Sequence, residues 1–221
     1  MKIIAYIKTP FREKFGIPRQ SGIVNVEGKI IFEKEYRVAE AFRGLEDYSH
    51  IWLLWSFSMH EGKGWSPTVR PPLLGGNKRM GVFATRSPFR PNPIGLSCVE
   101  LKKIEYTKEY GPVLYVSGPD LMDGTPIYDI KPYLPYADAF PEASGGFTDT
   151  LEKREIDVVI RTELFDTLPR SVQDEVLQIL SNNPTPSYKE DGKLYAMKYD
   201  DYDISFEITD GVLYIDDIKK P

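Results

Sequence analysis

Residues 81–97 read GVFATRSPFRPNPIGLS. Three prolines fix backbone φ angles and remove N–H donors, so this stretch suits neither a helix nor a central strand. Arg86 and Arg90 lie among these prolines and have little conformational freedom to lose on binding. Preorganised guanidinium groups suit a carboxylate or a phosphate. The stretch therefore predicts a rigid binding loop; the alternative is that its arginines pair with internal acids.

Charge is distributed unevenly along the 221 residues, although the net charge is only -5. Residues 1–103 carry 17 Lys and Arg against 9 Asp and Glu, whereas residues 104–221 carry 11 against 24. No acid lies between Glu61 and Glu100. The cations of that interval are Lys63, Arg70, Lys78, Arg79, Arg86 and Arg90. They predict a cationic surface that can recruit a polyanion; the alternative is an ordinary solvated basic surface.

Composition excludes several classes of protein. A hydrophobic content of 41% with 13% aromatic residues is enough for a folded core. The longest apolar run, at 51–57, is too short to span a bilayer. The first 16 residues lack the apolar core and cleavage site of a signal peptide. A single cysteine, Cys98, excludes an intrachain disulfide. We therefore expect a cytoplasmic protein without a membrane partner.

Metal and nucleotide motifs are also missing from the sequence. Two histidines and one cysteine argue against a zinc site, and we expect no metal, although oxygen ligands for magnesium or calcium stay open. Neither G-x-G-x-x-G nor the P-loop pattern occurs. A nucleotide-type ligand would have to be held in another way. No G-x-S-x-G hydrolase turn is present either.

Short strand-like segments dominate the first 120 residues, with glycine and proline between them. This pattern predicts a mainly β N-terminal barrel, not a Rossmann sheet. The expected strands are 3–8, 21–32, 49–57, 81–85, 96–106 and 113–118. Residues 62–80 should form a long functional loop. Residues 118–140, rich in proline and tyrosine, are expected to be irregular.

The C-terminal part has a different pattern. The linker-like run PEASGGFTDTLE begins at residue 141 and predicts a boundary between domains 1–144 and 145–221. Apolar residues recur at helical spacing over 171–181, with Ser171 as the expected N-cap. Three alternating strands follow, with a tight turn at Asp210-Gly211 between the last two. The expected C-terminal domain is a small α+β unit.

The opening stretch resembles the signature of the TsaA-like, or TrmO, family of methyltransferases. Further segments resemble that family in the same order along the chain. They are FREKFGIPRQSG (11–22), DYSHIW (47–52), RPPLLGGNKRMG (70–81) and DLMDGTPIYDIKPYLPYAD (120–138). The resemblance implies an S-adenosylmethionine-dependent enzyme with a β-barrel core. It also implies homodimers that methylate N6 of N6-threonylcarbamoyladenosine at position 37 of tRNA, in the anticodon loop.

The resemblance further implies which residues bind the cofactor. These are Gln20, Ser21, Gly22, His60, Glu61, Arg86, Leu96, Gly124, Thr125, Pro126 and Ile127. In the C-terminal domain, a family motif D-P-R-P-A-Y that helps to engage tRNA corresponds to NPTPSY at 183–188. The prolines and the tyrosine are kept, whereas the acid and the arginine are not. Expected RNA contacts are Arg70, Lys78, Arg79, Arg90, Pro184, Pro186 and Tyr188.

Removal of the N6 proton would help the modified base to attack. Tyr136 and Asp138, in the segment PYLPYAD, are our hypothesis for the groups that assist. Arg86 or Arg90 could meet the threonyl carboxylate. Two other functions stay open. One is a family member that acts on a different RNA or small substrate, and the other is a non-catalytic RNA-binding protein.

Overall fold

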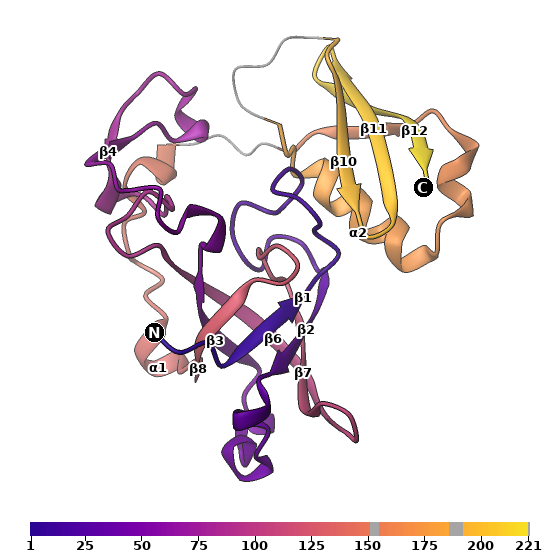
Figure 1. The fold of residues 1–221 in the computed structure, drawn as a ribbon. Helices are drawn as coiled ribbons and strands as arrows, with labels where there is room; N and C mark the ends of the chain where they lie inside the picture. The colour runs from indigo at the N-terminus through magenta and orange to yellow at the C-terminus, as the bar shows by residue number, and fades with distance from the viewer. Residues whose placement is uncertain (151–154, 186–191, 221) are drawn as a thin grey trace.

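The computed structural model describes residues 1–150, 155–185 and 192–220. A closed antiparallel barrel occupies the lower part of Figure 1, and a separate sheet with a helix lies above it. The barrel order is β1-β2-β7-β6-β3-β8. The strands are β1 (Ala5–Lys8), β2 (Glu27–Phe32), β3 (His50–Ser56), β6 (Ile94–Thr107), β7 (Gly111–Ser117) and β8 (Pro126–Pro132). The predicted mainly β, non-Rossmann N-terminal barrel is therefore confirmed.

Alternation of apolar and polar side chains explains why these strands close into a barrel. Successive side chains of a strand point to opposite faces, so one set can fill the interior. Ile7, Ile30, Leu53 and Leu114 all have fully buried side chains and belong to one core cluster. Closure pairs every barrel strand on both sides and leaves no open sheet edge.

Strand β8 corrects the expectation that residues 118–140 are irregular. It pairs with both β1 and β3 and so closes the barrel. Its two prolines are its first and last residues, Pro126 and Pro132, where a missing N–H does least harm to the ladder. The short helix α1 (Pro135–Asp138) follows directly.

The strand expected at 81–85 is also wrong. Only β5 (Met80–Gly81) pairs, with β4 (Thr68–Val69), and a 3-10 helix follows at Val82–Ala84. The carbonyl of Val82 accepts hydrogen bonds from the Thr85 hydroxyl and the Arg90 guanidinium, so the loop's own side chains take the place of a strand partner. The other 3-10 helices are Lys34–Tyr36, Ala39–Phe42, Leu45–Asp47, Ser58–His60, Pro72–Leu74, Gly146–Thr150 and Glu163–Thr167.

The C-terminal unit is a four-stranded sheet with one long helix. Its strand order is β10-β11-β12-β9, with β9 parallel to β12. The elements are β9 (Asp157–Ile160), α2 (Arg170–Ser181), β10 (Leu194–Tyr199), β11 (Tyr202–Thr209) and β12 (Val212–Lys219). The three predicted strands are confirmed. So is the tight turn, where Asp210 and Gly211 have φ angles of 51° and 78°, the pattern of a type I′ hairpin.

The start of α2 differs from the expectation. The helix begins at Arg170, and its N-cap is Pro169 instead of Ser171. The Pro169 carbonyl accepts the first helical hydrogen bond from the Gln173 N–H at 3.0 Å. In the part of the chain that the structure describes, α2 and the other helices are all too short or too polar to cross a membrane.

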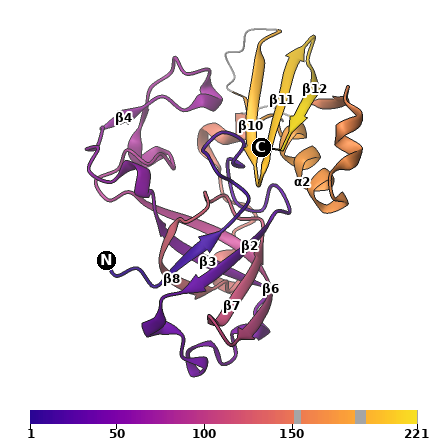
Figure 2. The same ribbon diagram turned by 45° about the vertical axis from the view of Figure 1, so that its right-hand side comes forward.

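Residues 9–26 lie between the barrel and the C-terminal unit (Figures 1 and 2). They connect β1 to β2, yet Phe11, Val24 and Val26 are buried in the core cluster of the C-terminal unit. We call this segment the junction. The strand expected at 21–32 begins only at Glu27, because Val24 and Val26 pack against elements more than 130 residues away.

Gly95 provides a test of the barrel packing. It lies opposite Trp55 in the β3–β6 ladder, and a Cβ at this position would overlap the Trp55 indole. Replacement Gly95→Ala should therefore lower the free energy of unfolding by about 1–3 kcal/mol, as overpacking does. Denaturant titration measures this. Gly81→Ala is the matched control, since nothing lies within 4 Å of a Cβ there and its φ is -58°. An unchanged stability of Gly95→Ala would contradict the packing.

Candidate functional site

A pocket of about 680 Å³ opens at the end of the barrel where β3 ends and β6 and β8 begin. It collects segments that are far apart in the sequence. They are 14–20 in the junction, 55–60 after β3, 85–90 in the proline-rich loop, 94–96 in β6, and 120–125 before β8. A volume of this size is typical of sites for small molecules.

The pocket brings together part of the expected cofactor set. Gln20, His60, Arg86, Leu96 and Thr125 line it. The other residues of that set do not line the pocket, but each lies one or two positions along the chain from a residue that does. They are Ser21, Gly22, Glu61, Gly124, Pro126 and Ile127. The structure therefore brings five members of the set together at one opening.

The non-lining members of the set hold the wall in place. The Ser21 hydroxyl accepts a hydrogen bond from the Cys98 N–H at 3.2 Å, which fixes the junction against β6. The Glu61 carboxylate accepts hydrogen bonds from the hydroxyls of Ser56 and Tyr128. Ile127 is fully buried in the barrel core.

The two arginines of the proline-rich loop have different roles. The guanidinium of Arg86 is exposed and donates a hydrogen bond to the side-chain oxygen of Gln20. The guanidinium of Arg90 donates to the carbonyls of Val82 and Thr85, at 3.1 and 2.7 Å. Arg90 therefore braces its own loop, whereas Arg86 joins that loop to the junction across the pocket.

His60 lies in an aromatic part of the wall. Its imidazole meets the ring of Phe89 edge-on, with centroids 5.1 Å apart, and that of Phe57 at 6.4 Å. Burial, followed by the positive charges of Lys14 and Lys63, lowers the pKa of His60 below its ordinary value of 6.5. The ring is therefore neutral at pH 7 and does not add to the positive charge of the pocket.

Asp120 lines the pocket but was not among the expected catalytic or binding residues. Its carboxylate accepts a hydrogen bond from the Ser97 hydroxyl, which in turn accepts one from the Trp55 indole N–H at 2.9 Å. Burial raises the pKa of the Asp120 carboxyl, against the opposing effects of the Ser97 hydrogen bond and of Arg86. The available signal was Ser97, a small polar residue at a buried position of a barrel strand.

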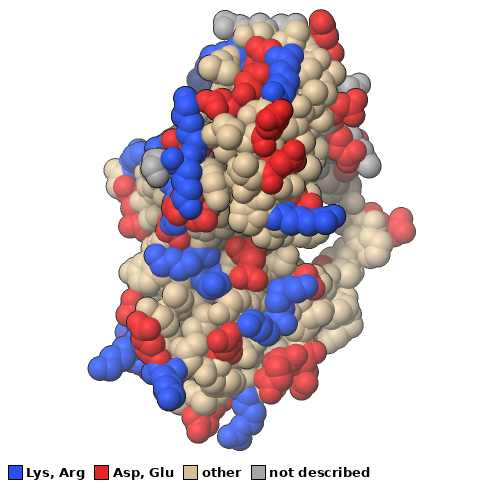
Figure 3. Space-filling model, turned by 90° about the vertical axis from the view of Figure 1, so that its right-hand side faces the viewer, with Lys and Arg blue, Asp and Glu red and all other residues tan. Residues whose placement is uncertain are grey.

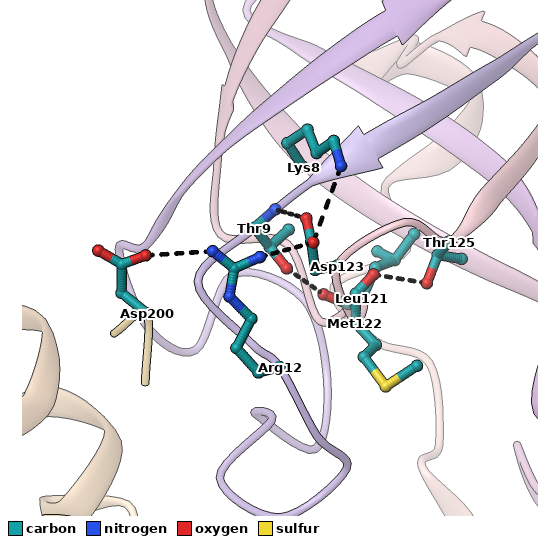
Figure 4. A network of polar contacts seen from close by, with 8 residues as sticks. All are labelled: Lys8, Thr9, Arg12, Leu121, Met122, Asp123, Thr125 and Asp200. Atoms are coloured by element: carbon teal, nitrogen blue, oxygen red, sulfur yellow. Dashed lines mark hydrogen bonds and ion pairs between the residues drawn. The ribbon is translucent and has the colours of Figure 1, made fainter. Parts of the chain in front are cut away.

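The turn at 120–125 is fixed by the network of polar contacts drawn in Figure 4. The Asp123 carboxylate accepts hydrogen bonds from the Thr9 N–H at 3.1 Å and from the Arg12 guanidinium at 2.7 Å. Arg12 also contacts Asp200 in the β10–β11 hairpin at 3.3 Å. The Thr125 hydroxyl donates to the Met122 carbonyl at 2.6 Å. One arginine of the junction therefore links the pocket turn to the C-terminal unit.

A second arginine of the junction makes a similar link. The Arg19 guanidinium donates to the carbonyls of Asn183 and Thr185, at 2.8 and 3.1 Å. Arg19 also lines the pocket beside Gln20. The start of the expected tRNA-contacting loop is thus held next to the pocket. Pro184 lies in this held stretch, whereas Pro186 and Tyr188 lie outside the described residues.

The other expected RNA contacts lie on the long loop between β3 and β6. Arg70, Lys78 and Arg79 are exposed, and Arg79 donates a hydrogen bond to the Thr68 hydroxyl at 2.7 Å. Their loop reaches the pocket near its two ends, through 55–60 and 85–90, and at Pro72. A different face, shown in Figure 3, has Lys and Arg interspersed with Asp and Glu over both units.

Tyr136 and Asp138 are placed away from this pocket. They lie on α1, which follows the far end of β8, next to the start of β3. The Asp138 carboxylate accepts hydrogen bonds from the Trp52 indole and the Leu134 N–H, at 3.0 and 2.8 Å, and both lower its pKa. Tyr136 is 87% exposed. Their role in catalysis stays a prediction, and their position away from the pocket of the same chain does not support it.

Family models match both units of the chain. The model for the tRNA-methyltransferase O N-terminal domain matches residues 6–139, and the model for the TrmO C-terminal domain matches residues 156–221. The two models leave unmatched only the first five residues and the linker between the two matched ranges.

Individual relatives cover nearly the whole chain. The tRNA (adenine(37)-N6)-methyltransferase of Escherichia coli K12 is 43% identical over 217 residues, which cover 94% of this chain and 92% of the relative. A Pseudomonas aeruginosa protein named RcsF, whose name places it among S-adenosylmethionine-dependent methyltransferases, is 40% identical over 91% of this chain and 89% of its own length. The crystal structure of TrmO from Pseudomonas aeruginosa superposes with a TM-score of 0.79 at 34% identity, covering 99% of this chain and 95% of that one.

The protonation of His60 gives a direct test of the pocket's electrostatics. Its imidazole should titrate below 6.5, because burial and two lysines disfavour the charged ring. NMR titration measures this, with the signal assigned by its loss in His60→Gln. Replacement Lys14→Gln removes one of the positive charges and should raise the pKa. A titration above 6.5, or no response to Lys14→Gln, would contradict this placement of His60.

Proposed function

The chain belongs to the tRNA-methyltransferase O family, and we propose that it uses S-adenosylmethionine to methylate N6 of N6-threonylcarbamoyladenosine at position 37 of tRNA. As a family member it is a tRNA (adenine(37)-N6)-methyltransferase, like the relative from Escherichia coli. The proposal adds the methyl donor and the threonylcarbamoyl group. The observation that carries it is the pocket that the junction, the proline-rich loop and the 120–125 turn build together.

The residues of the pocket fit S-adenosylmethionine. This cofactor supplies an electrophilic methyl group on a sulfonium sulfur. A flat base and aliphatic atoms suit the apolar part of the wall, which includes Phe57, Met59 and Leu96. Gln20, which accepts a hydrogen bond from the Arg86 guanidinium, offers an amide to the polar part of the cofactor. Neutral His60 adds a polar group without a competing positive charge.

The substrate RNA would approach across the long cationic loop. Arg70, Lys78 and Arg79 are exposed there, and no acid occurs from residue 62 to residue 99. Contacts of lysine and arginine with phosphates supply most of the affinity for nucleic acid, independent of sequence. The start of the 183–188 loop, held by Arg19, flanks the pocket from the C-terminal unit. The base would have to leave its stack to enter the pocket.

Recognition of the threonylcarbamoyl group needs a cation near the reacting nitrogen. Arg86 suits this role better than Arg90, because the Arg90 guanidinium is engaged by two backbone carbonyls of its own loop. The pocket also has apolar wall area for the aliphatic part of the threonyl group. A carboxylate on the base would thus favour the modified adenosine over plain adenosine.

The expected homodimer and cytoplasmic location stay predictions. A second copy would find large apolar side chains exposed on the long loop, with exposed fractions of 54% for Trp65 and 72% for Phe83. Exposed apolar groups of this kind often mark contact surfaces between proteins. Cytoplasmic location is expected because tRNA is the substrate.

Methyl transfer to defined tRNAs tests the proposal. Labelled S-adenosylmethionine is incubated with the protein and with tRNA that carries or lacks the threonylcarbamoyl group at adenosine 37. Nucleoside mass spectrometry should find one added methyl group on the modified nucleoside only. Arg86→Ala should raise the KM for the modified tRNA, because a charge-assisted hydrogen bond is lost. Equal methylation of both tRNAs would contradict the proposed selectivity, and transfer to neither would contradict the substrate.

A further inference from the structure

The pocket contains one carboxylate among several cations. Of the residues that line it in the described part of the chain, Lys14, Arg19, Arg86 and Arg90 are cationic, and Asp120 alone is acidic. Asp120 is partly exposed, whereas Ser97 and Trp55, which hold it, are buried. Because Asp120 lines the pocket and is not fully buried, a molecule in the pocket can reach this residue.

Methylation of an N–H nitrogen requires that a proton leaves. The N6 nitrogen of the modified base carries one hydrogen, and its lone pair is delocalised into the neighbouring carbonyl group. When the new N–CH₃ bond forms and the S–CH₃ bond breaks, the sulfur leaves as a neutral thioether and one proton must be taken up. A positioned side chain that accepts this proton speeds such reactions by about 10²–10⁴-fold.

We propose that Asp120 is the catalytic residue that accepts the N6 proton, held in place by Ser97 and Trp55. This inference rests on the proposed function and names the base of that reaction. The carboxylate enters the step ionised and leaves it protonated, and the proton then passes to solvent when the product departs. The step needs no reactant besides the methyl donor, the modified base and the Asp120 carboxylate.

The geometry favours this role in two ways. Ser97 donates its hydroxyl hydrogen to one carboxylate oxygen, Oδ1, and accepts from the Trp55 indole at 2.9 Å. The backbone N–H groups of Ser21 and of Asp120 itself also contact the carboxylate. These donors hold the group in one orientation, as an efficient proton acceptor requires.

The electrostatic surroundings point the same way. Burial raises the pKa of the Asp120 carboxyl above the ordinary value for aspartate, so the carboxylate is a stronger base than one in water. The Ser97 hydrogen bond, the two N–H groups and the positive charge of Arg86 oppose this rise, because each favours the ionised form. A carboxyl that only bound a cation would have its pKa lowered.

Other proton acceptors near the reaction are less suitable. His60 also lines the pocket, but burial and the charges of Lys14 and Lys63 lower its pKa, so its imidazole is a weak base. Asp138 is outside the pocket, and two hydrogen bonds lower its pKa as well. Asp120 is therefore the best-placed acceptor that the pocket offers.

The first experiment compares Asp120→Asn with wild type and with the control Asp129→Asn, whose carboxylate lies on β8 and pairs with Lys131 at 2.9 Å. The dissociation constant of S-adenosylmethionine is measured by calorimetry, and methyl transfer to modified tRNA is measured in single-turnover reactions. Asp120→Asn should bind the donor with an affinity within a few-fold of wild type and transfer methyl on the order of 10²-fold or more slowly. Asp129→Asn should match wild type in both.

Two results would overturn the inference. The first is a large loss of donor affinity in Asp120→Asn with a transfer rate near that of wild type at saturating donor, which would make Asp120 a donor-binding residue. The second is an equal rate in Asp120→Asn and wild type. Wild-type protein is assayed before any variant. If it transfers no methyl group to modified tRNA, the proposed function itself is wrong.

The pH dependence supplies a readout that a merely structural role would not change. The group must be ionised, so the transfer rate should fall as the pH drops through the pKa of Asp120. Ser97→Ala removes a hydrogen bond that lowers this pKa, so the acid limb of the profile should move to higher pH. NMR titration of the Asp120 carboxyl carbon, without donor or RNA, should show the same shift. An unmoved acid limb and carboxyl pKa in a folded Ser97→Ala protein would contradict the inference.

Discussion

The packing of Phe11 against the C-terminal sheet is the contact on which the rest of the structure depends. Phe11 belongs to the chain that leaves β1, yet its ring is buried and meets that of Tyr199 edge-on, with centroids 5.9 Å apart. The Asp200 N–H donates to the Pro10 carbonyl, and the Asp123 N–H donates to the Phe11 carbonyl.

Burial of one phenylalanine is worth about 1.5–3 kcal/mol. The Arg12 ion pairs, with a guanidinium 43% exposed, are worth about 1 kcal/mol or less. Apolar packing therefore holds the two units together, and the ion pairs set the orientation of the pocket turn.

Proline content explains how the opposite wall is held. The proline-rich loop has few backbone N–H groups to pair, and its carbonyls at Val82 and Thr85 accept hydrogen bonds from Arg90 instead. Arg86 therefore does not have to brace the loop, and its guanidinium donates a hydrogen bond to the side chain of Gln20. A loop fixed in this way loses little entropy when a ligand binds. Of the pocket arginines, Arg90 and Arg19 thus donate to backbone carbonyls, whereas Arg86 donates to the side chain of Gln20.

The sequence predicted the barrel, the C-terminal unit and several pocket segments, because alternation, turn residues and the family signature are local in the chain. It missed β8, since prolines at both ends of that strand looked like a loop. It placed the N-cap of α2 two residues late, at Ser171 instead of Pro169, since serine is a common N-cap. It named Asp138 as a catalytic group and not Asp120, because only the closed barrel shows that Asp120 lines the pocket. The contacts of the junction with residues 165–218 could not be read from local patterns at all.

Hydrogen exchange of backbone amides, with and without S-adenosylmethionine, tests most directly whether the junction joins the pocket to the C-terminal unit. Donor binding should slow exchange in residues 120–125 and 9–20, and also at Asp200, whose N–H bonds to the Pro10 carbonyl. The Arg12→Leu variant loses the contacts with both Asp123 and Asp200, so it should lose part of the protection at 120–125 and at Asp200. Protection confined to the barrel in wild-type protein, with no change in the β10–β11 hairpin, would contradict the account.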